Sequence, residues 1–188
     1  MTQTTIHTRQ GLPPEMQLLL RDYPRDAWPD HPDFAESIRN WMGAHHMFRQ
    51  LAGITQKDTE KMMDRTIDPA HYADRLAHFG TLLVRNLHGH HGWEDHSFFP
   101  ELNAADPRFE RGLDMLEGDH VELDDVLDRF TRQGNRIVQL HQLDPDQIPE
   151  QAKLLHGLTK EIGLFLTRHL RDEEDLVVPI LLHHQLRG

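Results

Sequence analysis

Four long stretches of helical periodicity dominate the sequence, and Asp-Pro pairs divide them. Apolar residues recur in these stretches at steps of three and four, which is typical of amphipathic helices. The dividing pairs are Asp68-Pro69, Asp106-Pro107 and Asp144-Pro145. Asp at an N-cap followed by Pro in the first turn favours a helix start, although the last helix has an alternative start near Pro149. The sequence therefore predicts helices over residues 34–66, 69–101, 107–142 and 149–186.

The segment before these helices has a different composition. Residues 1–33 contain five prolines, with Tyr23 and Trp28 between them, so a long helix is excluded there. Each predicted helix is long enough to cross a small domain at ~1.5 Å per residue, and short links favour antiparallel neighbours. We therefore expect an all-α fold, an up-down-up-down antiparallel four-helix bundle over residues 34–188 that is preceded by an N-terminal arm over residues 1–33.

The composition of the 188 residues excludes several classes of function. Asp and Glu total 31 against 20 for Lys and Arg, a formal net charge of −11, so we expect no nucleic-acid partner. No run of about 18 apolar residues occurs, which predicts a cytoplasmic protein without a membrane partner. Cysteine is absent while histidine occurs 16 times, so any metal must be bound by nitrogen and oxygen atoms.

Histidines interrupt the apolar faces of the predicted helices. In the third helix, His120 follows Leu113 and Leu116 on the apolar face and precedes Leu123. In the first helix, the apolar register selects His45 rather than the adjacent His46, because neighbouring residues on a helix point about 100° apart. The second and fourth helices each place a His and a Glu one turn apart on the apolar face. These pairs are His90 with Glu94 and His169 with Glu173.

The second and fourth helices also share a longer pattern. His90 precedes Pro100 by ten residues, as His169 precedes Pro179, and apolar residues stand before each proline. Two carboxylates on apolar faces, without an inward Lys or Arg, are costly unless they bind a cation. Four imidazoles and two carboxylates exceed the needs of one tetrahedral zinc ion. They suit two adjacent ions bridged by Glu94 and Glu173, with iron or manganese preferred.

These residues resemble the hemerythrin family, in particular the His-His-Glu cation-binding domains, over residues 34–186. The segments LHGHHGWED and HLRDEEDLVVP are similar to the signature segments of that family. The resemblance implies a non-haem centre of two iron ions with an oxo or hydroxo bridge, and manganese or zinc as less favoured metals. The implied metal ligands are His45, His90, Glu94, His120, His169 and Glu173.

Three further residues are alternative ligands. Oxygen carriers of the family have a second histidine on the third helix, where this chain has Asp124. Asp124 could coordinate as a carboxylate, or His91 could supply a further imidazole. Glu174 occupies the position of the bridging carboxylate in oxygen carriers, whereas the helical register favours Glu173.

The resemblance implies a protein that binds or senses dioxygen, nitric oxide or iron. One alternative is a di-iron oxidoreductase that decomposes peroxide or reduces nitric oxide, and another is a protein for iron storage or scavenging. The expected small ligand is dioxygen or nitric oxide. The sequence names no protein partner.

Overall fold

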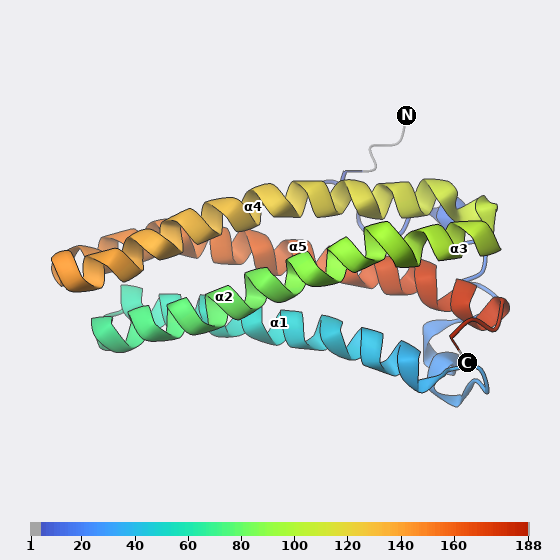
Figure 1. The fold of residues 1–188 in the computed structure, drawn as a ribbon, viewed down its shortest axis with the longest axis horizontal. Coiled ribbons are helices and arrows are strands. Elements are labelled where there is room, and N and C mark those ends of the chain that lie inside the picture. Colours follow the sequence, from blue (N-terminus) through green and yellow to red (C-terminus); the bar gives the residue numbers. More distant parts are fainter. Residues whose placement is uncertain (1–4, 188) are drawn as a thin grey trace. The chain divides into compact units, whose positions relative to one another are not determined.

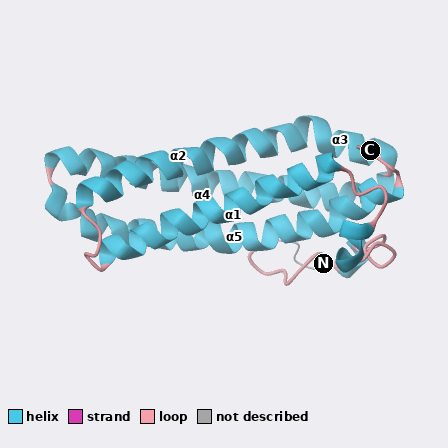
Figure 2. Cartoon of the chain, turned by 90° about the horizontal axis from the view of Figure 1, so that it is seen from below, coloured by secondary structure: helices cyan, strands magenta, loops and turns pink. Residues whose placement is uncertain are grey.

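The computed structural model describes residues 5–187, and within that range all regular structure is helical (Figure 2). The all-α fold class is therefore confirmed, and the extensive packing of the helices is consistent with a helical bundle. The up-down-up-down order of the helices stays a prediction. The α-helices labelled in Figure 1 are α1 (Glu36–Met63), α2 (Pro69–Trp93), α3 (Phe99–Ala105), α4 (Glu110–Leu143) and α5 (Ile148–His183).

The Asp-Pro pairs mark helix starts as the sequence predicts. The side chain of Asp68 accepts a hydrogen bond from the backbone N–H of His71, 3.0 Å away, in the first turn of α2. Asp106 accepts one from the backbone N–H of Arg108 and caps a 3-10 turn, Pro107–Phe109, that leads into α4. A similar turn, Pro145–Gln147, precedes α5, so this helix begins close to the alternative start near Pro149.

The predicted second helix, 69–101, is wrong in one respect, because it is not continuous. After α2 ends at Trp93, a π-helical segment, Glu94–Phe98, leads into α3, which ends at Ala105. Pro100 lies in the first turn of α3 and has no N–H for the carbonyl four residues before it. The wider π turn accommodates this loss, and such turns occur frequently at functional sites.

The chain comprises two compact units. Unit 1 consists of Met1–His46, His91–Val121 and Phe165–Gly188. Its core combines apolar side chains of all three segments, among them Trp28, Phe99 and Leu176. Gly112 packs directly against Leu176, because a Cβ atom at Gly112 would lie 2.8 Å from Cδ2 of Leu176. Two short 3-10 helices, Pro14–Met16 and Arg25–Asp30, lie in the segment before α1, and Leu12, Met16, Leu19 and Trp28 bury it in this core.

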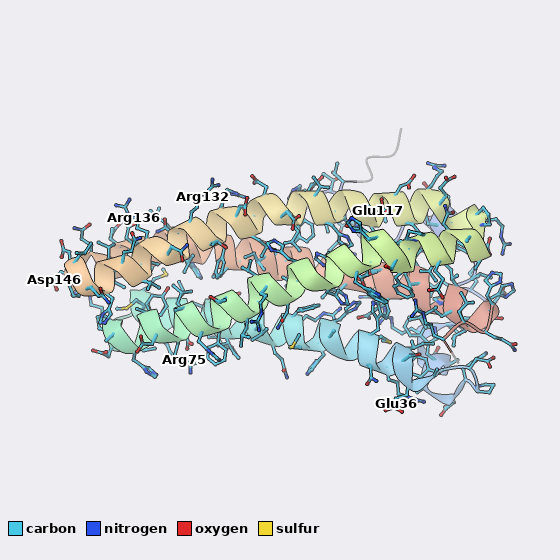
Figure 3. All side chains as sticks on the ribbon, viewed as in Figure 1. Glu36, Arg75, Glu117, Arg132, Arg136 and Asp146 are labelled. Atoms are coloured by element: carbon cyan, nitrogen blue, oxygen red, sulfur yellow. The ribbon has the colours of Figure 1, made fainter. Side chains whose placement is uncertain are left out.

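Unit 2 consists of Met47–His90 and Glu122–Leu164. Its interior is mainly apolar, and the buried Tyr72 hydroxyl lies 3.1 Å from that of Thr59. Burial raises the pKa of Tyr72 to about 12. Arg75, labelled on α2 in Figure 3, donates from Nε to the buried carboxylate of Asp58 at 2.6 Å. Among the described helices, none combines the length and apolar character that crossing a bilayer demands.

Candidate metal centre

Three buried histidines of unit 1 form an imidazole cluster: His91 of α2, His120 of α4 and His169 of α5. One ring nitrogen of each lies within 4.8 Å of those of the other two. The Nε2 atoms of His120 and His169 are 3.1 Å apart. The ring of His91 stacks on that of His120, with centroids 3.9 Å apart and an interplanar angle of 7°. The three rings therefore present nitrogen atoms to one small volume.

A second group in unit 1, the mixed cluster, combines His45 of α1, Glu94 of the π segment and Glu173 of α5. All three residues are fully buried. Nε2 of His45 lies 3.4 Å from Oε2 of Glu173, and ligand atoms of the three residues lie within 4.8 Å of one another. An imidazole and two carboxylates are donors that iron and manganese accept.

The two glutamates connect the mixed cluster with the imidazole cluster. Oε2 of Glu94 lies 3.8 Å from Nε2 of His120. Oε2 of Glu173 likewise lies 3.8 Å from Nε2 of His169. Each carboxylate is thus near a nitrogen of the imidazole cluster while it belongs to the mixed cluster. Both carboxylates could therefore coordinate a metal cation together with imidazole nitrogens.

Carboxylates outside the clusters determine which ring nitrogen of His169 and of His120 carries a proton. Nδ1 of His169 lies 3.0 Å from Oδ2 of Asp119, and Nδ1 of His120 lies 2.7 Å from Oδ1 of Asp95. Since a carboxylate accepts hydrogen bonds, Nδ1 donates in both rings. Burial opposes ionisation of Asp119, but hydrogen bonds from His169 and Arg9 hold the pKa of this carboxyl below its usual range.

This arrangement leaves the Nε2 atoms of His120 and His169 facing each other. Burial lowers the pKa of His169 to about 4, so its ring is neutral at pH 7 and Nε2 carries a lone pair. Two buried ring nitrogens that face each other at 3.1 Å, each in a ring whose other nitrogen contacts a carboxylate, are the donors that a cation between the rings would use. The imidazole cluster therefore fits a metal ion.

The mixed cluster shows the same need for a cation. Nδ1 of His45 lies 3.0 Å from Oε1 of Glu174, which leaves Nε2 directed at Glu173. Among residues 5–187, no hydrogen-bond donor satisfies either carboxylate oxygen of Glu173. Burial, together with the adjacent Glu94 carboxylate, raises the pKa of Glu173 well above its usual range. Glu94 receives a hydrogen bond from Nε1 of Trp41 at 2.7 Å.

The sequence-predicted residues have different places in the structure. The two clusters contain His45, His91, Glu94, His120, His169 and Glu173. Glu174 contacts the other nitrogen of His45 rather than the one that faces Glu173. The Asp124 side chain is 59% exposed and pairs with His88 at 3.3 Å. His90, half-buried, is the last residue of unit 2, where its ring lies 5.0 Å from that of Phe48.

The supporting carboxylates were absent from the sequence prediction. Asp95, Asp119 and Asp172 directly follow or precede predicted ligands, and Asp119 and Asp172 are buried. Their only signal in the sequence is an acidic residue directly beside a predicted ligand, and acidic residues on solvated helix faces give the same signal. Arg9, which contacts two of these carboxylates, has no signal, because it lies 110 residues before Asp119.

Comparison with known proteins agrees with this geometry. The family model described as the hemerythrin HHE cation binding domain matches residues 36–181. That range contains both clusters and most of the chain. No curated protein and no solved structure matches the chain. The extent of the family match shows that this chain belongs to the hemerythrin HHE cation-binding domain family.

Proposed function

We propose that the protein binds two iron ions in a non-haem centre and uses them to bind or sense dioxygen, nitric oxide or iron. The residues that would hold the metal are His91, His120 and His169 at one ion and His45 at the other, with Glu94 and Glu173 shared. The observation that carries the proposal is the pair of Nε2 atoms, 3.1 Å apart, in rings whose Nδ1 atoms face carboxylates. The assignment of His90 as a further ligand remains a prediction from the sequence.

The donor set supports iron over zinc. It contains imidazole nitrogens and carboxylate oxygens only, and it exceeds the four donors of a tetrahedral site. Iron bound by such donors supplies a redox-active centre with positions for a small ligand. Manganese shares the preference for these donors, so metal analysis has to distinguish the two.

Aromatic side chains around the clusters limit the access of water. The Trp41 ring lies 4.4 Å from that of His45, and the Phe99 ring lies 5.8 Å from that of His120. On α5, the Phe165 ring lies 5.9 Å from that of His169. A dry environment restricts proton delivery and protects a reduced metal. The aromatic surroundings of the clusters therefore favour reversible binding or sensing over peroxide decomposition, nitric oxide reduction or iron storage.

Metal analysis after anaerobic loading with Fe(II) tests the proposal. We expect about two iron ions per chain, as two donor groups joined by carboxylates imply. His169→Ala should lose iron, whereas the control His184→Ala should retain it, because His184 pairs with Asp106 instead. One tightly held zinc ion per chain would contradict the proposal.

Exposure of the reduced, iron-loaded protein to dioxygen then separates binding from turnover. A spectral change that reverses on degassing supports carriage or sensing. Steady consumption of added peroxide identifies an oxidoreductase instead.

A further inference from the structure

Arg9, from the segment before α1, reaches the imidazole cluster through one carboxylate. Its Nε donates to Oδ2 of Asp172 at 2.7 Å, and its two terminal nitrogens donate to the two oxygens of Asp119, with Nη1 at 2.9 Å from Oδ1. The Arg9 side chain is 3% exposed. Oδ2 of Asp119 lies 3.0 Å from Nδ1 of His169. A continuous hydrogen-bonded path therefore connects Arg9 with His169.

Arg25, in the same segment, reaches the mixed cluster in the same way. Its Nη1 donates to Oε2 of Glu174 at 2.6 Å, and Oε1 of Glu174 lies 3.0 Å from Nδ1 of His45. Asp175 accepts from Nε of Arg25 at 3.0 Å, and the guanidinium lies 4.7 Å from the ring of Trp28. Each cluster thus contains one histidine that is oriented by a carboxylate paired with an arginine of this segment.

Burial makes these arginines important for the histidines. Asp119 and Glu174 are nearly inaccessible to water, and a buried carboxylate that loses its cationic partner recruits water or turns toward another donor. Either change frees the ring of the histidine that the carboxylate holds. Partners of this kind typically alter metal affinity about 10–100-fold, because they fix the tautomer and orientation of the ligand.

We propose that Arg9 and Arg25 are positioning residues of the metal centre: Arg9 orients His169 through Asp119, and Arg25 orients His45 through Glu174. Docking of residues 5–33 is then a condition for holding the metal, and metal binding in turn stabilises the docked segment. The inference concerns the same histidines that the proposed function assigns to iron. Its expected effect on iron binding therefore rests on the proposed function, whereas the contacts of Arg9 and Arg25 do not.

The first experiment uses the metal-free protein with ¹⁵N-labelled histidine. Arg9→Met should shift the ring signals of His169 and leave those of His45 unchanged. Arg25→Met should do the opposite. Arg9→Lys should restore part of the His169 signal, since a lysine supplies the charge but not the two-pronged donation. If the arginines only stabilised the fold, each variant would shift the ring signals of both histidines.

The second experiment measures iron release to a colorimetric chelator after loading with Fe(II). Both Met variants should release iron about 10–100-fold faster than the unmodified protein. Arg75→Met is the matched control, because Arg75 also pairs with a buried carboxylate, Asp58, at 2.6 Å. No histidine contact of Asp58 is found within residues 5–187, so this variant should lose thermal stability without faster release.

The outcomes separate the inference from the proposed function. Failure of the unmodified protein to bind iron, with the histidine-specific shifts present, overturns the proposed function and leaves the positioning roles supported. Iron binding with neither shifts nor faster release overturns the inference. Equal shifts of both histidines in both variants indicate general loosening and also overturn it.

Discussion

The Nε2 atoms of His120 and His169 lie 3.1 Å apart, while the Nδ1 atom of each ring faces a separate aspartate. Neighbouring residues repeat this pattern, since His45 faces Glu174 with Nδ1 and Glu173 with Nε2. In each of these three histidines, one nitrogen is held by a carboxylate and the other is directed toward the clusters. Such second partners orient the ligands of metal sites and raise their basicity.

The buried carboxylate of Glu173 should destabilise the metal-free protein. Its carboxylate is buried beside Glu94 and has no hydrogen-bond donor among residues 5–187. Glu173→Leu should therefore raise the unfolding free energy of the metal-free protein by about 1–3 kcal/mol, and it should abolish iron binding. Urea unfolding without metal and iron analysis after loading give the two readouts. Glu150→Leu is the control on the same helix, because Glu150 is 72% exposed, and an equal stabilisation there would contradict the argument.

Trp41 should support the mixed cluster through one hydrogen bond. Its Nε1 donates to Oε1 of Glu94 at 2.7 Å. Trp41→Phe retains an aromatic ring but removes this donor from a buried carboxylate, which should lower the unfolding free energy by about 1–3 kcal/mol. Iron release should also accelerate. Chelator kinetics and urea unfolding measure both effects. An unchanged rate of iron release together with reduced stability would show that Trp41 stabilises the fold without supporting the metal site.

Tyr72 should make unfolding sensitive to alkaline pH. Its folded-state pKa of about 12 exceeds the ordinary value near 10, so the folded state favours the protonated phenol. The stabilisation is fully present below pH 10 and declines as the pH rises from 10 toward 12, by up to about 1.4 kcal/mol per pH unit. Tyr72→Phe should flatten this decline in urea unfolding between pH 9 and pH 11. An identical slope in both proteins would assign the alkaline sensitivity to other groups.

Gly112 should tolerate no side chain without a loss of stability. A Cβ atom there would lie 2.8 Å from Leu176, three residues after Glu173. Gly112→Ala should destabilise the protein by about 1–3 kcal/mol through overpacking. The matched variant is Gly157→Ala on α5, where no heavy atom lies within 4 Å of the added carbon. It should stabilise the helix by about 0.5–1 kcal/mol. Thermal unfolding compares the two, and equal signs would refute the packing argument.

Helix positions and most inward-facing residues were predictable from the sequence, because both depend on local periodicity. The Asp-Pro pairs begin helices as expected, and the apolar register selects His45, Glu94, His120, His169 and Glu173, which lie in the two clusters. His90, which the register also selects, stays a prediction, whereas its neighbour His91 entered only as an alternative ligand. The structure places His91 in the imidazole cluster. The π segment after Trp93, which local periodicity does not encode, changes the register from there on.

The sequence by itself determined an all-helical protein with histidines and glutamates on the apolar faces of its helices, since helical periodicity is a property of neighbouring residues. Only the tertiary structure decided which ring nitrogen is available in His45, His120 and His169. That choice depends on carboxylates from other helices, such as Asp119 for His169, and on Arg9, 163 residues before Asp172. Hydrogen bonds between such distant residues exist only after packing has brought their helices together, so no local pattern records them.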